Sequence, residues 1–279
     1  MKQQMLLVAG LCFVMAVRAQ NDTTTPKPQS GSHGDTIRIG EMIIIKNGNG
    51  QSGDGSVVHV SHRHNYKPSN VSTNWIILDF GFTNYTDNTN YSSSAAQSFA
   101  PGSTSDWFNL RNNKSVDVNI WLFMQRLNMV NHVLNLKYGL GIELNNYRYS
   151  SPILYSQNPN PLISYDTQRH YSKNKLAADY LTVPLMLNFN FTPHRKEGFG
   201  FSVGASAGYL YNSRQKTVTA EDGKQKSHNS YNLDPWKISW IAEVQLGPIK
   251  LYGSLATKSM FDKGLDQIPY TFGLRFSNW

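Results

Sequence analysis

The chain has 279 residues, of which 16% are charged and 12% aromatic, with a net charge of +8 and one cysteine, Cys12. Its basic residues are spread through loops and strand ends, which disfavours a nucleic-acid partner because nucleic-acid binding needs basic residues gathered on one face. The lone cysteine lies in the first nineteen residues, which excludes a disulfide or a thiolate metal site from the remainder.

Residues 1–19 predict a secretory signal peptide. Lys2 precedes the apolar run MLLVAGLCFVMAV, and the small residues Val17 and Ala19 predict cleavage after Ala19. A membrane anchor helix is the alternative, but the run is well short of the roughly 20 apolar residues that span a bilayer. Cleavage would remove Lys2 and Arg18, leaving a mildly basic chain of charge +6.

Residues 20–73 predict a periplasmic extension. The segment from Gln20 to Gly34 is polar and contains proline, a composition typical of linkers. The following TIRIGEMIIIKNG (36–48) predicts one strand, which we expect to pair with Ser56 to Val60 as a small hairpin.

Residues 74–279 predict one all-β domain. The strands that we expect are 74–86, 114–128, 132–149, 174–191, 199–216, 233–247, 249–261 and 268–278. Long connections (87–113, 150–173, 217–232) alternate with short ones (129–131, 192–198, 247–248). Eight strands with long loops at one rim and tight turns at the other are typical of an eight-stranded antiparallel up-and-down transmembrane β-barrel.

The strands alternate between apolar and polar residues, and two kinds of barrel fit this alternation. A secreted soluble lipocalin-like barrel would turn the apolar row inward around an apolar ligand, whereas a membrane barrel turns it out to lipid. The glycines favour the membrane barrel, because the interior of eight strands is narrow and Gly204, Gly139 and Gly273 lie on the polar row. We therefore expect Leu140 and Phe272 to face lipid.

The polar row also carries charges that a closed lumen can pair. Its acids and bases are Asp79, Asp117, Glu143, Glu243, Lys137, Lys237, Lys250 and Arg275. We expect a buried, mutually paired network and not solvated surface charge. On the apolar row we expect, among others, Ile76, Val118 and Met124.

Aromatic residues near strand ends predict interface girdles at the two membrane surfaces. They are Tyr85, Tyr91, Trp107, Tyr147, Tyr149, Tyr209, Tyr211, Trp236, Phe261 and Trp279. Each strand also exceeds the roughly 9–11 tilted residues that cross the hydrocarbon.

Several segments together resemble those of PorT-type outer-membrane β-barrel proteins. They are the signal peptide, TIRIGEMIIIKNG, LDFGFTNYT (78–86), YGLGIELNNYRY (138–149), YLTVPLMLNFNF (180–191) and YTFGLRFSNW (270–279). The resemblance implies the barrel fold and an association with secretion, and it assigns no functional residue. Outer-membrane strands often end with an aromatic residue in phase with the apolar row, which the assembly machinery recognises. Trp279 is out of phase with Phe276 and Leu274, so either a bulge near Ser277 and Asn278 is needed or the signal is imperfect.

Two sets of residues could support other chemistry. His59, His62 and His64 could ligate a transition metal, but no carboxylate is near them in sequence, and a polar connector is the preferred interpretation. Asp166, His170 and Asp179, on or beside the second long loop, could serve a hydrolase, but no GxSxG-like nucleophile signature accompanies them. We therefore expect no catalytic residue, no metal and no cofactor.

The amide and aromatic character of that loop suits partner binding, with Tyr155, Tyr165 and Tyr171 as candidates. We expect an integral outer-membrane barrel with a side-chain-filled lumen, acting as a structural, surface-binding or secretion- and assembly-associated module. The expected partners are outer-membrane lipid, the barrel assembly machinery and an envelope or secretion protein. The alternatives are the soluble lipocalin-like barrel and an outer-membrane barrel enzyme.

Overall fold

A computed structural model describes residues 36–39, 42–45, 59–61, 68–156, 160–195 and 198–277. The chain divides into two compact units, 1–68 and 69–279. The predicted signal peptide and its cleavage site lie outside the described residues, as does Trp279 with its phase.

The first unit contains a three-stranded antiparallel sheet of β1 (Thr36–Ile39), β2 (Met42–Ile45) and β3 (His59–Ser61). The Ile-rich segment therefore forms two strands that pair with each other, and the prediction of a single strand was wrong. The expected pairing across the glycine-rich segment is confirmed, since Ile45 pairs with His59.

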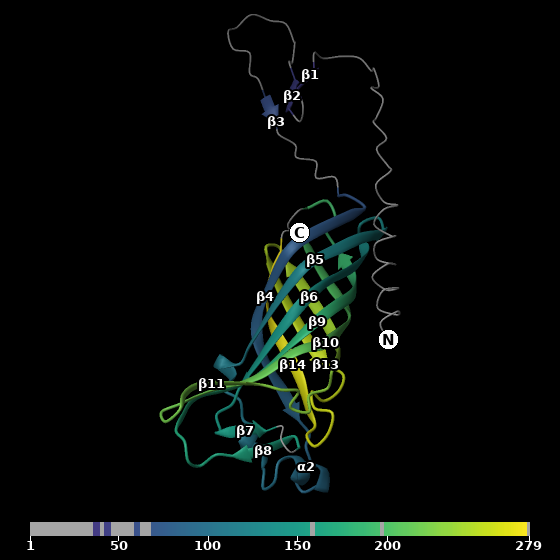
Figure 1. Ribbon diagram of the computed structural model, residues 1–279. Helices are drawn as coiled ribbons and strands as arrows, with labels where there is room; N and C mark the ends of the chain where they lie inside the picture. Colours follow the sequence, from purple (N-terminus) through teal and green to yellow (C-terminus); the bar gives the residue numbers. More distant parts are fainter. Residues whose placement is uncertain are drawn as a thin grey trace, which may run out of the picture. The chain divides into compact units, whose positions relative to one another are not determined.

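The second unit is the predicted eight-stranded barrel (Figure 1). Its strands are β4 (Val71–Asp87), β5 (Val116–Val130), β6 (Leu134–Arg148), β9 (Tyr171–Asn190), β10 (Phe199–Thr219), β12 (Trp236–Leu246), β13 (Ile249–Ala256) and β14 (Gln267–Phe276). Each pairs antiparallel with its neighbours in chain order, and β14 pairs with β4 to close the ring.

The connections alternate in length as predicted. The short ones are 131–133, 191–198 and 247–248, whereas the long ones are 88–115, 149–170, 220–235 and 257–266. The long connections hold the remaining elements: α2 (Ser94–Phe99), the 3-10 turns η2 (Ser105–Phe108) and η3 (Asn112–Lys114), β7 (Ile153–Ser156), β8 (Leu162–Tyr165) and β11 (Gly223–His228). Figure 1 shows α2, β7 and β8 together at one end of the barrel.

The barrel is polar inside and apolar outside. Trp240 and Phe272 are 62% and 57% exposed, whereas Glu143 and Lys137 are 5% and 1% exposed. All eight predicted charged residues of the polar row are buried, which confirms the expected orientation. The alternative of a lipocalin-like barrel with an apolar interior was wrong, because bulky apolar side chains point away from the lumen.

Close packing inside the barrel explains the glycines. A Cβ atom on Gly141 would lie 2.6 Å from Cε3 of Trp121, and one on Gly81 would lie 2.8 Å from the Tyr252 hydroxyl. Real Cβ atoms do not approach other atoms this closely, so these two strand positions have no room for a side chain.

A bulge reverses the alternation near the short-turn end of β4 and β5. Trp121 pairs with Gly141 but Phe123 with Leu140, so residues on the two sides of Leu122 differ in parity. Met124, expected to face lipid, is consequently buried in the lumen with Ile77 and Trp121. The alternation alone could not place it, because a bulge adds one residue to one strand.

Candidate functional site

The lumen contains a continuous set of ion pairs, which we call the luminal network. The Arg275 guanidinium donates to both carboxylate oxygens of Asp79, at 2.7 Å each, and to Oε2 of Glu243 at 2.6 Å. Lys137 Nζ donates to the other Glu243 oxygen at 2.6 Å. Two cations thus share one carboxylate, which compensates the cost of burying each charge.

Neutral donors complete the network. Trp121 Nε1 donates to Asp79 at 2.7 Å, and Asn119 Nδ2 donates to Asp117 at 2.9 Å, while the Tyr252 hydroxyl also donates to Asp117. Arg275 lies 5.5 Å from the centre of the Trp121 ring, within cation–π range. Sequence analysis missed Trp121 and Tyr252, although Tyr252 follows Lys250 at the two-residue spacing of the polar row.

The other two luminal bases, Lys237 and Lys250, do not pair with Asp79 or Glu243. Lys237 Nζ pairs with Glu143 at 2.8 Å, as a separate ion pair. Lys250 pairs with no acid among the described residues, and donates instead to the backbone and hydroxyl oxygens of Ser277. The expected mutual pairing is therefore confirmed except at Lys250 and Asp117, which form no ion pair among the described residues.

The luminal network fills the barrel. A cavity of about 20 Å³ is lined by residues including Asn119, Trp121, Glu143, Tyr252 and Arg275. Such a volume holds about one water molecule. Around these ion pairs, the described part of the lumen therefore has room for about one water molecule.

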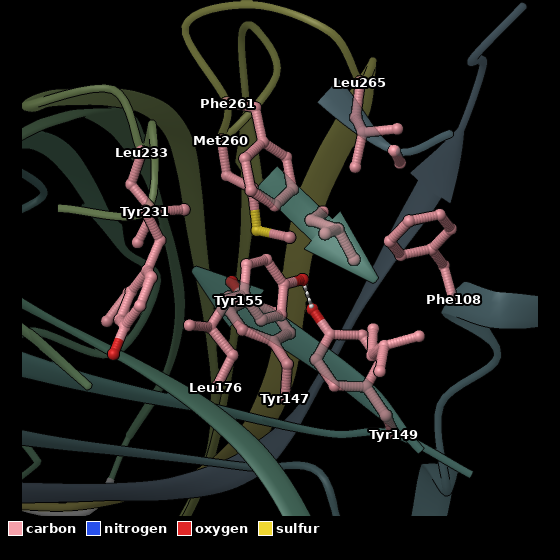
Figure 2. Close-up of a cluster of buried hydrophobic side chains, with 14 of the residues drawn as sticks. Phe108, Tyr147, Tyr149, Tyr155, Leu176, Tyr231, Leu233, Met260, Phe261 and Leu265 are labelled. Carbon is pink, nitrogen blue, oxygen red and sulfur yellow. Dashed lines mark hydrogen bonds between the residues drawn. The ribbon is translucent and has the colours of Figure 1, made fainter. Parts of the chain in front are cut away.

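The long connections fold together into a second structure, which we call the loop dome (Figure 2). Its buried core residues are Phe99, Ala100, Phe108, Tyr147, Tyr149, Ile153, Tyr155, Ile163, Leu176, Ala178, Tyr180, Tyr231, Leu233, Met260, Phe261 and Leu265. All four long connections contribute to this core, together with the adjoining ends of β6 and β9. The loops therefore form one packed body that covers the end of the barrel (Figure 1). Its many aromatic pairs stabilise this body beyond the burial of apolar area alone.

The hairpin of β7 and β8 lies at the centre of the loop dome. The Tyr149 and Tyr155 hydroxyls lie 2.7 Å apart, as drawn in Figure 2. Gln215 of β10 accepts from the Tyr155 backbone N–H at 3.0 Å and donates to the Ile153 carbonyl at 2.8 Å. Burial raises the pKa of Tyr155 well above the usual value for a phenol, so its hydroxyl stays protonated and available as a donor.

The aromatic residues predicted as girdles divide into two groups. Tyr209, Tyr211 and Trp236 are exposed on the barrel wall, as expected of a girdle. Tyr147, Tyr149 and Phe261 lie in the core of the loop dome, and Tyr85, Tyr91 and Trp107 pack against it, so their assignment to the girdle was wrong. Sequence position alone could not separate the two groups, because both lie near strand ends.

The residues considered for hydrolysis do not meet. Asp166 binds Arg169 at 2.9 Å and the Tyr171 hydroxyl at 2.7 Å, whereas Nδ1 of His170 lies 2.7 Å from Glu221. Asp179 pairs with Arg214 on the barrel wall. Burial opposes the charged form of Asp166, but the hydrogen bonds from Tyr171 and Arg169 outweigh this effect and lower its pKa.

Two further sets of residues were considered from the sequence: tyrosines for partner binding and histidines for a metal. Tyr155 is buried and unable to contact a partner, whereas Tyr165 is 44% exposed and packs against Trp107, with ring centres 5.0 Å apart. His62 and His64 lie outside the described residues, and only the backbone of His59 is described. Across the described parts of the chain, no three His, Cys, Asp or Glu side chains are grouped as metal ligands would be.

Residues 73–274 match the model of a family described as outer membrane protein beta-barrel domain. The match covers the whole ring of strands except the first residues of β4 and the last of β14. A comparison with curated proteins finds no match.

Proposed function

Because the chain belongs to the outer membrane protein beta-barrel domain family and is an integral outer-membrane barrel protein, we propose that it acts as a surface-binding module with a closed lumen. In this proposal the barrel anchors the protein, and the loop dome presents the contact surface. Long loops of outer-membrane barrels lie on the extracellular side, which is where such a surface would meet its partner.

The packed core of the loop dome is the observation that carries the proposal. Loops that merely close a barrel need not bury twelve of their side chains against one another and against the adjoining strand ends. A surface held rigid by such a core loses little conformational entropy on binding. Tyr165, which is exposed and packs against the half-buried Trp107, is of the aromatic type enriched at protein contacts.

A secretion or envelope protein is the partner that the sequence resemblance favours. The segments 78–86, 138–149 and 270–279 resemble PorT-type barrels, which are associated with secretion. Kinship with that group therefore stands as a proposal, supported by these segments and by the shared barrel fold. Binding is favoured over catalysis by the separation of Asp166, His170 and Asp179 into three different contacts.

Site-specific photo-crosslinking tests the proposal. A benzoylphenylalanine at Tyr165 should give a discrete cross-linked protein in intact cells, because this side chain is exposed on the loop dome. The same group at Trp240, which is 62% exposed on the barrel wall, is the matched control and should react with lipid and give no protein band. Equal protein cross-linking at both positions, or none at Tyr165, would contradict a contact surface on the loop dome.

A further inference from the structure

Six basic residues of β9, β10 and β11 gather on one outward face of the barrel, next to the loop dome. We call this group the basic ribbon; its members are Lys173, Lys175, Arg214, Lys216, Lys224 and Lys226. Lys216 pairs in register with Lys175 on one side and with Lys226 on the other. Cross-strand partners point to the same face about 5 Å apart, so three lysines form a row, which Arg148 of β6 continues opposite Lys175.

A bulge in β10 brings this ribbon together. Tyr209 pairs with Leu181 and faces outward, but Asn212 pairs with Asp179, so one residue is inserted between the two registers. Beyond the bulge the even-numbered residues Arg214 and Lys216 face outward, whereas Gln215 is buried under the loop dome. The sequence-based expectation that the basic residues are dispersed was therefore wrong for these residues.

The lower end of the ribbon lies at the height of lipid headgroups. On β10 the outward apolar side chains run from Phe199 to Tyr211, which spans about 30 Å of membrane at roughly 3.3 Å per residue and a tilt of about 40°. Tyr209 and Trp236 mark the upper edge, with ring centres 5.1 Å apart. Arg214 lies three residues further along, about 8 Å higher, at the outer edge of the interfacial layer that is roughly 5–8 Å thick on each side. Lys216 lies about 13 Å above Tyr211, from where its long side chain can extend back toward the headgroups.

The charge of the ribbon is largely uncompensated. Asp179 pairs with Arg214, while Glu221 and Asp222, in the turn beyond Thr219, pair with His170 and Arg169. Within the described residues, Lys173, Lys216, Lys224 and Lys226 form no ion pair. Like charges on neighbouring strands repel, so the row is destabilising unless an anion lies against it.

Protection of an exposed sheet edge does not explain the ribbon. Lysines on edge strands prevent sheets from pairing with other chains, and this role would suit Lys224 and Lys226 on β11. Lys175 and Lys216, however, have register partners on both sides: Lys175 lies between Arg148 and Lys216, and Lys216 between Lys175 and Lys226. Interior strands need no such protection.

We infer that the basic ribbon binds the phosphate groups of anionic lipids in the outer leaflet around the barrel. The apolar barrel wall next to the ribbon would contact the acyl chains of the same lipid molecules. One lipid molecule would thus bind both surfaces, with its headgroup on the ribbon and its acyl chains on the wall. Lysine and arginine near a membrane surface attract anionic headgroups in this way. The inference does not depend on what the loop dome binds.

Native mass spectrometry of the full chain in detergent tests the inference. The protein is titrated with phosphatidylglycerol or with phosphatidylcholine of the same chain length, and bound lipids are counted. We expect preferential retention of phosphatidylglycerol, and we expect the triple variant Lys173→Gln, Lys216→Gln, Lys226→Gln to bind it about a hundredfold more weakly, since each lysine contributes roughly fivefold. The matched control Lys114→Gln, Lys258→Gln, Lys263→Gln removes the same charge elsewhere on the loop side and should bind as the unchanged protein does.

Two results would overturn the inference: no preference for the anionic lipid in the unchanged protein, or equal losses in both triple variants. If the ribbon variant does not fold, as judged by heat-modifiable gel migration, the lipid preference of the unchanged protein is measured as a function of salt and tests the inference instead. Raising NaCl from about 0.05 to about 0.5 M should abolish an electrostatic preference, because the screening length falls below about 5 Å. A preference that persists at high salt would also contradict the inference.

Discussion

Arg275 shows how much of the barrel's stability depends on single buried side chains. Its guanidinium compensates two carboxylates, Asp79 and Glu243, in a lumen with little room for water. A buried carboxylate that loses its partner is strongly destabilising, because neither solvent nor another cation replaces the lost interactions. The position was predictable from sequence, since Arg275 lies on the polar row between Leu274 and Phe276.

The variant Arg275→Met should reduce the free energy of unfolding by about 3–5 kcal/mol. The midpoint of urea unfolding, followed by heat-modifiable migration in detergent, measures the loss. Lys250→Met is the matched control, because Lys250 is buried in the same lumen but, among the described residues, donates only to Ser277. Its replacement should cost no more than about 1–3 kcal/mol. Equal losses for the two variants would refute a special role of the luminal network.

The carboxylate of Asp166 should make the stability of the loop 149–170 depend on pH. Because the pKa of Asp166 is lowered in the folded protein, its stabilising contribution is present at neutral pH, above the pKa of an unfolded Asp of about 3.9. The contribution is lost as the pH falls from that value through the lower folded pKa. Amide hydrogen exchange at Gln168, whose N–H donates to Asp166, should therefore accelerate on acidification beyond the intrinsic rate change. The variant Asp166→Asn should show the faster exchange already at neutral pH, and unchanged protection in this variant would argue against the carboxylate as the cause.

The elements that sequence predicted well are those with a regular period. All eight barrel strands were located because alternation and loop length recur along the chain. Bulges were not predicted, since the inserted residue near Leu122 or Tyr211 leaves no mark in composition. Their consequences are the inward position of Met124 and the outward position of Arg214.

We expect the packing of the loop dome to depend on the hairpin of β7 and β8. Tyr155→Ala removes a buried ring that contacts Tyr149, Tyr231 and Phe261, which costs about 3–5 kcal/mol locally. We expect the loops of this variant to become sensitive to protease while the barrel keeps its heat-modifiable migration, because the luminal network is untouched. Limited proteolysis with mass analysis of the fragments measures this difference.

The matched control for that experiment is Tyr165→Ala, which removes an exposed ring from the same hairpin. Its loops should resist protease as those of the unchanged protein do. Simultaneous loss of the barrel in Tyr155→Ala would show that the loop dome and the barrel fold as one unit and would contradict their independence.

At the scale of the whole molecule, two different packed structures occupy the lumen and one end of the barrel. The luminal network fills the membrane level, and the loop dome covers one end. The closed lumen was predictable from sequence, because glycines and paired charges on the polar row indicate a crowded interior. The loop dome was not, because its core is assembled from irregular segments without a period.

These two barriers can be separated by conductance. We expect no steady ion current from the unchanged protein in planar bilayers, and none after deletion of the loop-dome residues 152–165, because the luminal network alone fills the narrow interior. A single-channel current after the deletion would show that the loop dome is the barrier and that the lumen is permeable. Heat-modifiable migration of the deletion variant verifies that the barrel is intact.

The contact between Arg275 and Asp79 joins the last strand of the ring to the first, and the two residues are register partners. A nascent barrel that closed one position out of step would turn Arg275 toward the acyl chains and leave Asp79 facing an apolar side chain. Such a mistake would be heavily penalised at the moment of closure. The ion pair therefore favours closure of the ring in one register, because a shift by one residue would separate the two charges.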